Sequence, residues 1–124
     1  MFEQLNELEY RAQTGKRYIL YFLKFWQPEE KTGDFVVKYQ IRAEKKDIVW
    51  YGRISQKRAY RDLGIDKQMQ KTKPPDTLER LIKRHLQSML VHVIKKGLDK
   101  GYEEPNTEFV FYLDQPIIRR TWQG

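Results

Sequence analysis

The 124-residue chain contains no cysteine and no long apolar run. Without cysteine it has no disulfide framework, no thiol nucleophile and no thiolate zinc site. Its longest apolar run, residues 18–23, is far shorter than the roughly 20 residues that a membrane-spanning helix needs. Residues 1–7 are acidic, whereas a signal peptide begins with basic residues. We therefore expect a cytoplasmic protein without a membrane partner.

Catalytic and metal-binding patterns are also missing. The sequence has neither a Gly-x-x-x-x-Gly-Lys phosphate loop nor a Gly-x-Ser-x-Gly nucleophile turn. Its only histidines, His85 and His92, are about 10.5 Å apart along a helix, too far to share one zinc ion. The acidic pairs Glu29-Glu30 and Glu103-Glu104 fall in predicted turns, where carboxylates are usually solvated. We expect no catalysis, no metal and no cofactor.

What the chain does contain is enough apolar material for one folded domain. Hydrophobic residues make up 40% of the sequence and aromatic residues 14%, which excludes a disordered chain. Chains of this length usually form one domain, so we expect residues 1–124 to fold as a single α+β domain.

The first half predicts a helix followed by three strands. Helical spacing of Phe2, Leu5, Leu8 and Ala12 predicts a short helix over 2–13. Strands are predicted at 17–27, 34–43 and 48–55, with turns at 28–33 and 44–47. The first strand has apolar residues in both alternating sets, which is typical of a central strand covered on both faces.

The second half predicts a long helix and a last strand. Residues 57–63 have helical character, and the polar stretch 66–75 is expected to be a loop. Asp76 followed by Glu79 resembles a capping box, and Gly97 or Gly101 is the expected helix end. Alternation predicts a strand over 107–114, while the tail 117–122 is left unassigned. An apolar stripe at helical spacing should pack this helix on the sheet; it consists of Leu78, Leu81, Ile82, Leu86, Met89, Leu90, Val93 and Ile94.

These elements predict an α+β fold with one antiparallel sheet. Its parts are a short N-terminal helix, a three-stranded antiparallel meander, a long amphipathic helix packed on the sheet and one further C-terminal strand.

Charge is the most informative functional feature of the sequence. The net charge is +7, and the basic residues concentrate between about residues 42 and 84. The charged residues within 102–114 are all acidic. Segregated positive charge is typical of nucleic-acid binding. If residues 44–47 form the turn, Lys38 lies opposite Arg53, and an anion would relieve the repulsion between them. The first strand would add Lys24 to the same row, with Phe22 and Trp26 beside it, although a slip of one residue would reverse its faces.

We therefore predict a small basic module that contacts DNA or RNA phosphates, with Tyr51 stacking on bases if the ligand is single-stranded. An ordinary solvated basic surface fits the same residues. A third interpretation is a protein-interaction factor: an adaptor or inhibitor, for example from a phage or mobile element, that binds a larger protein or ribonucleoprotein machine, or a homodimer. The high content of aromatic residues suggests this interpretation, because an aromatic sheet face that stays uncovered often marks an interface. The predicted nucleic-acid contacts are Lys38, Arg42, Lys45, Lys46, Tyr51, Arg53, Lys57, Arg58 and Arg61.

Overall fold

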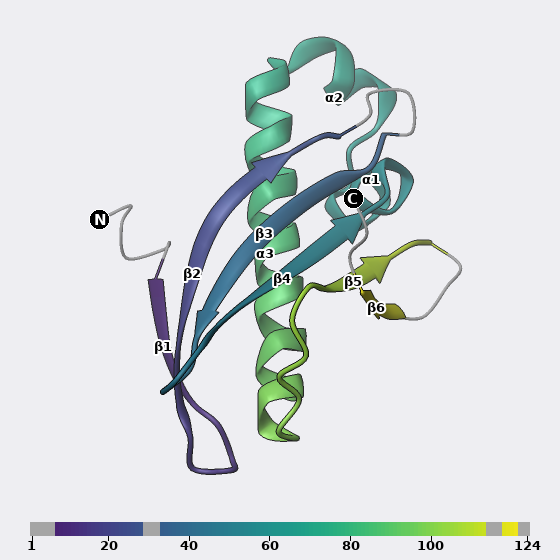
Figure 1. The fold of residues 1–124 in the computed structure, drawn as a ribbon. Helices are drawn as coiled ribbons and strands as arrows, with labels where there is room; N and C mark the ends of the chain where they lie inside the picture. The colour runs from purple at the N-terminus through teal and green to yellow at the C-terminus, as the bar shows by residue number, and fades with distance from the viewer. Residues whose placement is uncertain (1–6, 29–32, 114–117, 122–124) are drawn as a thin grey trace.

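The computed structural model describes residues 7–28, 33–113 and 118–121 (Figure 1). The start of the predicted N-terminal helix, the Glu29-Glu30 pair and the ends of the C-terminal tail lie outside the described residues. In chain order the elements are β1 (Glu7–Arg11), β2 (Arg17–Trp26), β3 (Phe35–Arg42), β4 (Asp47–Ile54), α1 (Gln56–Leu63), α2 (Lys67–Thr72), α3 (Pro75–Asp99), β5 (Thr107–Phe111) and β6 (Ile118–Thr121).

The strands form one six-stranded sheet in the order β1-β2-β3-β4-β5-β6, and α3 lies along one of its faces (Figure 1). This confirms an α+β fold in which a long helix packs on a sheet; β2, β3 and β4 pair antiparallel as expected, but β1 extends the predicted three-stranded meander to four strands. The expectation of an antiparallel sheet is wrong at one pair, since β5 runs parallel to β4. The connection explains this difference: α3, with 25 residues, is about 37 Å long and returns the chain to the edge where β4 begins.

The predicted helix over 2–13 is wrong where the structure describes it, because residues 7–11 form β1. Leu8 lies opposite Leu20 and Tyr10 lies opposite Tyr18, so the apolar residues of β1 face the same side as those of β2. From Glu7 to Ala12 polar and apolar residues alternate strictly, which is the period of a strand. Pairing with β2 therefore favours the strand over the helix.

A β-bulge explains why β2 looks apolar on both faces. The pairing of β2 with β3 shifts between Phe22 and Lys24, so Leu23 is the extra residue. After this shift Phe25, rather than Lys24, points to the same side as Phe22. The apolar pattern predicts coverage on both faces, whereas in the structure it reflects one strand whose side chains change faces at the bulge.

The helices differ from expectation mainly at their ends. The predicted turns at 57–63 are confirmed as α1, but the expected loop at 66–75 contains α2, whose first turn is capped by the Asp66 carboxylate accepting from the Met69 amide at 2.8 Å. The capping box at Asp76 is wrong: α3 begins two residues earlier than that cap implies, Pro74 is its N-cap, and no side chain caps it. The helix continues through Gly97, and Gly101 follows its end with a φ of +79°.

Helix α3 packs through a narrower ridge than the predicted stripe. Leu78, Ile82 and Leu86 are buried as predicted, whereas Met89 and Val93 are only half-buried beside the ridge. Two glycines permit the close approach: a Cβ on Gly52 would lie 3.0 Å from Leu90, and one on Gly97 would lie 3.4 Å from Trp50. The ridge consists of Leu78, Ile82, Leu86, Leu90, Ile94 and Leu98.

The C-terminal part of the sheet contains one strand more than predicted. The expected strand at 107–114 is β5, and the unassigned tail contributes β6, which pairs antiparallel with β5. Within the described part of the chain, no helix has both the length and the apolar character to cross a membrane.

Candidate nucleic-acid interface

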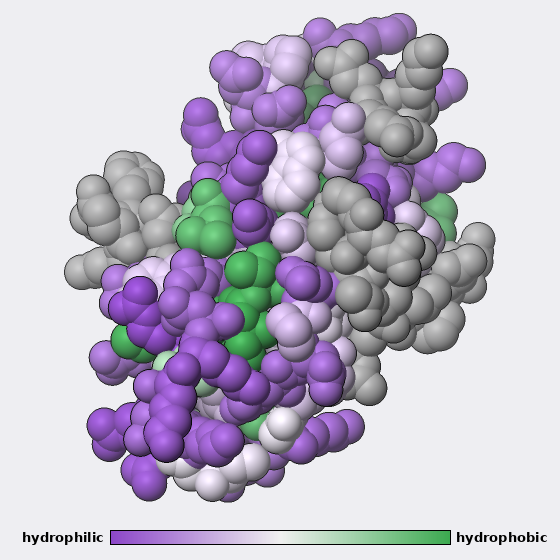
Figure 2. All heavy atoms as spheres, in the orientation of Figure 1, coloured by the Kyte–Doolittle hydropathy of each residue, from purple (hydrophilic) through white to green (hydrophobic). Residues whose placement is uncertain are grey.

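The face of the sheet opposite α3, called here the outer face, carries the candidate interface. The predicted residues Lys38, Arg42, Tyr51 and Arg53 all lie on it. Along β3 and β4 they alternate with the core residues, so their side chains point to the opposite face of the sheet. Figure 2 shows this face, on which hydrophobic residues form a central band bordered by hydrophilic side chains. Strand alternation in the sequence therefore predicted the shared face correctly.

The predicted pair of Lys38 and Arg53 is wrong. Lys38 lies opposite Tyr51, and Arg53 lies opposite Val36. The turn is tighter than expected, because Arg42 pairs with Asp47 and the Ala43 amide donates to the Lys46 carbonyl at 2.8 Å. The register thus moves by two residues, which changes every partner but keeps every face.

The bulge creates a different pair of like charges. Lys24 lies directly opposite Lys38 on the outer face. The Lys24 ammonium is 5.1 Å from the centre of the Trp26 ring, and that of Lys38 is 6.0 Å from the Tyr51 ring. Neither lysine forms an ion pair with any described carboxylate. Like charges directly opposite each other are destabilising, so an anion between them would stabilise this part of the sheet.

A second pair of like charges lies near the other end of β2. Arg11 and Arg17 are cross-strand partners, both are exposed, and neither forms an ion pair with a described carboxylate. The prediction missed both residues because it placed Arg11 on a helix. Between the two pairs, the Arg42 guanidinium lies 5.1 Å from the Tyr21 ring centre. We call Arg11, Arg17, Lys24, Lys38 and Arg42 the outer-face cations.

Arg53, a predicted contact, belongs instead to a buried network. Its guanidinium lies 3.2 Å from Glu108 and 3.3 Å from Asp34, and the Tyr112 hydroxyl donates to Asp34 at 3.0 Å. Burial alone would lower the pKa of Arg53, but the two carboxylates outweigh it and raise that pKa above its usual value. The Arg53 charge is therefore already balanced within the fold.

The remaining predicted cations do not join the outer face. Lys57, Arg58 and Arg61 belong to α1, which packs beside α3 through the buried Ala59. Arg58 and Arg61 each lie 3.2 Å from Asp62. Lys45 and Lys46 lie in the turn between β3 and β4, and the Lys46 ammonium is 3.1 Å from Glu103. The nine predicted residues therefore do not form one continuous surface.

The aromatic side chains available for stacking also differ from the prediction. Tyr51 exposes only 9% of its surface, and burial raises the pKa of its hydroxyl. Tyr21 and Trp26, which share the outer face, are half-buried and present more of their rings. They replace Tyr51 as the stacking candidates.

Glu103, in the loop after α3, contacts both the β1–β2 hairpin and the β3–β4 hairpin. These contacts make the stability of the fold sensitive to acid. Its carboxylate accepts a hydrogen bond from Tyr18 and lies close to Lys46 and Lys16. The Tyr18 hydrogen bond, followed by the two lysines, lowers the pKa of Glu103 despite its partial burial. A carboxyl pKa that is lower in the folded state stabilises the fold above the unfolded-state value of about 4.3, and this gain disappears as the pH falls through the folded value.

We therefore expect Glu103→Gln to flatten the loss of stability on acidification below about pH 4.3, measured as urea midpoints. Glu104→Gln is the control, because that side chain is exposed and forms no described ion pair. An unchanged acid dependence in Glu103→Gln would contradict this role.

His85 is a structural contact, since its Nε2 lies 3.0 Å from Asp62. Among the residues that the structure describes, no group of three His, Asp or Glu side chains has a spacing that could hold a metal ion. Comparison of the chain with protein-family models, curated proteins and solved structures finds no match in any of the three.

Proposed function

We propose that this protein binds single-stranded nucleic acid across the outer face of its sheet. One observation supports this above all: β2 presents two aromatic rings and two cations in one row on this face. From one end of β2 to the other the outer face presents Trp26, Lys24, Tyr21, Ile19 and Arg17. Basic grooves with interleaved aromatic rings are how single-strand binders hold phosphates and bases together.

Three cations of β2 and β3 would hold the phosphates. Lys24, Lys38 and Arg42 come from two neighbouring strands, and Lys24 and Arg42 are exposed. Arg42 also has an ion pair with Asp47, but both side chains are about half exposed, so the Asp47 contact is weak and exchangeable. Three cations in this arrangement would bind consecutive phosphates without reading sequence.

The rings favour a single strand over a duplex. Tyr21 and Trp26 are half-buried and each lies beside a cation. A base can stack on such a ring only when it is not already stacked in a duplex, and each such contact is worth about 1–3 kcal/mol. Discrimination against double-stranded ligands should therefore come from Trp26 and Tyr21.

Calorimetric titration with a single-stranded oligonucleotide of about 12 nucleotides, with hydroxyl groups at both ends, tests the proposal. Three phosphate contacts predict a slope of about −2 for log K against log salt. The double variant Lys24→Gln and Lys38→Gln should reduce that slope to about −0.7. Trp26→Leu should weaken single-strand binding but leave the weaker duplex binding unchanged.

The matched control changes two exposed cations of α3, Arg80→Gln and Arg84→Gln, which lie in the second basic stretch of the sequence. We expect this control to keep both the affinity and the salt slope. The opposite result, with binding lost in the α3 variant and kept in the β2–β3 variant, would assign the ligand to the helical side. Failure to bind any DNA or RNA at about 50 mM salt, where electrostatic attraction is strong, would exclude the function.

A protein partner is the second candidate, and Leu23 is its motive. The bulge leaves this side chain 44% exposed beside Lys24, which is the highest exposure of a large apolar residue in the described part of the chain. If the outer face instead joins two copies of the chain, light scattering should give the mass of a dimer. Leu23→Ser should then give a monomer.

A further inference from the structure

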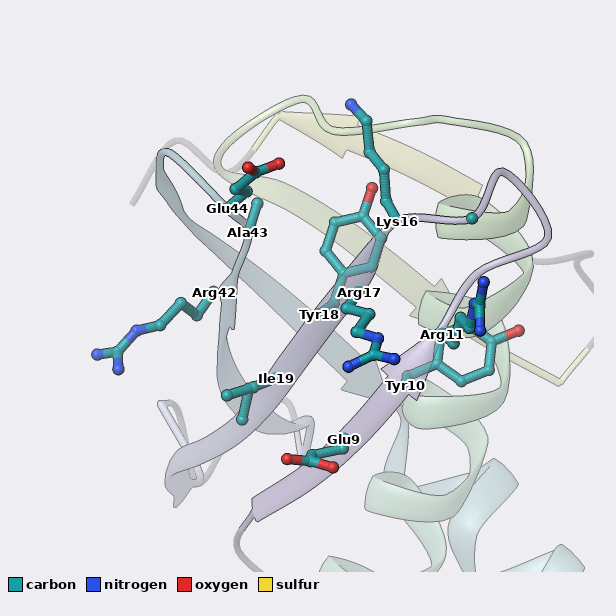
Figure 3. Close-up of a pocket in the computed structure, with 11 residues that line it drawn as sticks. Glu9, Tyr10, Arg11, Lys16, Arg17, Tyr18, Ile19, Arg42, Ala43 and Glu44 are labelled. Carbon is teal, nitrogen blue, oxygen red and sulfur yellow. The ribbon is translucent and has the colours of Figure 1, made fainter.

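A hollow of about 900 Å³ lies at the end of the outer face, between the β1–β2 hairpin and the turn that follows β3 (Figure 3). Four basic residues line it, Arg11, Lys16, Arg17 and Arg42, together with the side chain of Ile19. In Figure 3 the Arg42 guanidinium points away from those of Arg11 and Arg17, on the far side of Ile19.

Only two of these four cations remain without an acidic partner among the described residues. Lys16 lies 3.6 Å from Glu103, and Arg42 lies 3.4 Å from Asp47. Arg11 and Arg17 are directly opposite each other, with Cα atoms roughly 5 Å apart as cross-strand partners are. Glu9 and Glu44 also line the hollow, but no described ion pair joins either of them to Arg11 or Arg17. The hollow therefore has two arginines at its wall that are cross-strand partners.

We infer that this hollow binds a phosphate monoester, namely the terminal phosphate of the nucleic-acid strand, and this inference rests on the proposed function. A monoester has a charge of about −1.5 to −2 at pH 7, whereas each internal phosphodiester has one negative charge. Two arginines on neighbouring strands, directly opposite in register, can each offer a fork of N–H donors to such a dianion. An internal phosphodiester, with its one negative charge, would balance the positive charge of only one of the two arginines.

The position of the hollow supports a strand end rather than an internal nucleotide. Along β2, Arg17 is seven residues from Lys24, so the two sites are on the order of 20 Å apart. Beyond Arg17 the sheet stops, because residues 12–16 form the hairpin turn. A strand that follows β2 from Lys24 past Tyr21 and Arg42 would thus reach the hollow with its last nucleotide.

The test compares one oligonucleotide sequence with a 5′-phosphate, with a 3′-phosphate and with hydroxyl groups at both ends, by calorimetric titration. We expect one phosphorylated form to bind about tenfold more tightly than the hydroxyl form, which corresponds to about 1.4 kcal/mol. Its salt slope should be steeper by about 1.4, since two more cations are neutralised. Inorganic phosphate is titrated alone as a separate arm.

Variants of the arginine pair separate this inference from the proposed function. The double variant Arg11→Gln and Arg17→Gln should abolish the preference for the phosphorylated end, so that the three oligonucleotides bind with equal affinity. The double variant Arg80→Gln and Arg84→Gln should keep the preference. Arg17→Lys retains the charge without the fork and should reduce the preference only in part. Thermal melts check folding, which removal of two opposed like charges should not impair.

Two results would overturn the inference. Equal affinity for the three oligonucleotides would exclude a terminal-phosphate site while leaving the proposed function intact. Binding of inorganic phosphate that depends on Arg11 and Arg17, without binding of any oligonucleotide, would assign the hollow to a free phosphate. In that case the strand-end inference and the proposed function would both be wrong.

Discussion

Replacing Arg53 by methionine is expected to lower the free energy of unfolding by about 3–5 kcal/mol. The Arg53 side chain is 18% exposed and bridges Glu108, which is 2% exposed, to Asp34, which is 13% exposed. Methionine fills a similar volume but removes the positive charge. The Glu108 carboxylate would then remain buried without the guanidinium beside it, and removing the cation of a buried ion pair is costly.

The matched control removes both charges of the closest pair. In the double variant Arg53→Met and Glu108→Gln, at least half of the lost stability should return, because replacing a whole buried ion pair is often nearly neutral. Urea denaturation of the parent, both single variants and the double variant gives the coupling energy directly. A loss below about 1 kcal/mol in Arg53→Met would show that water or neighbouring groups replace the guanidinium, and that our account of this network is wrong.

Leu86→Ala is expected to cost about 2–5 kcal/mol of unfolding free energy. Leu86 is fully buried in the middle of the α3 ridge that packs on the sheet. Truncation removes apolar contacts and leaves a cavity, since helix and sheet are already close at Gly52 and cannot collapse far.

Ser88→Ala is the control for Leu86→Ala, since Ser88 is exposed on the same helix two residues further on. It should change stability by less than about 0.5 kcal/mol, as ordinary surface substitutions do. Urea denaturation measures both variants. A cost for Leu86→Ala within that same range would mean that the ridge is not the packing surface of α3.

The largest error in the predicted site shows what strand patterns leave open. Alternation in residues 34–43 placed Lys38 and Arg42 on one face, and the structure agrees. The same alternation fits any register that differs by two residues, so it could not say whether Lys38 faces Arg53 or Tyr51. Turn length decides between them, and Arg42 opposite Asp47 gives the tighter turn an ion pair at 3.4 Å.

The N-terminal segment shows a competition between two periods. Leu8 and Ala12 fit helical spacing, and Leu8, Tyr10 and Ala12 equally fit a strand. A helix there would bury only one apolar side. The strand buries its apolar side as well, and its backbone groups form hydrogen bonds with residues 17–21 of β2. Because local pattern does not contain this long-range pairing, the Arg11 and Arg17 pair was invisible in the sequence.

By itself the sequence determined the α+β class, the three strands β2 to β4, the long helix with its buried ridge, and the faces on which the residues of β3 and β4 lie. All of these follow from the periodicity of neighbouring residues, which is a local property. Only the tertiary structure decided the partners: Lys24 opposite Lys38 across a bulge, Arg11 opposite Arg17, β5 parallel to β4, and Arg53 inside a carboxylate network. Pairing, bulges and ion networks depend on which distant segments meet, and residue patterns along one segment do not encode that choice.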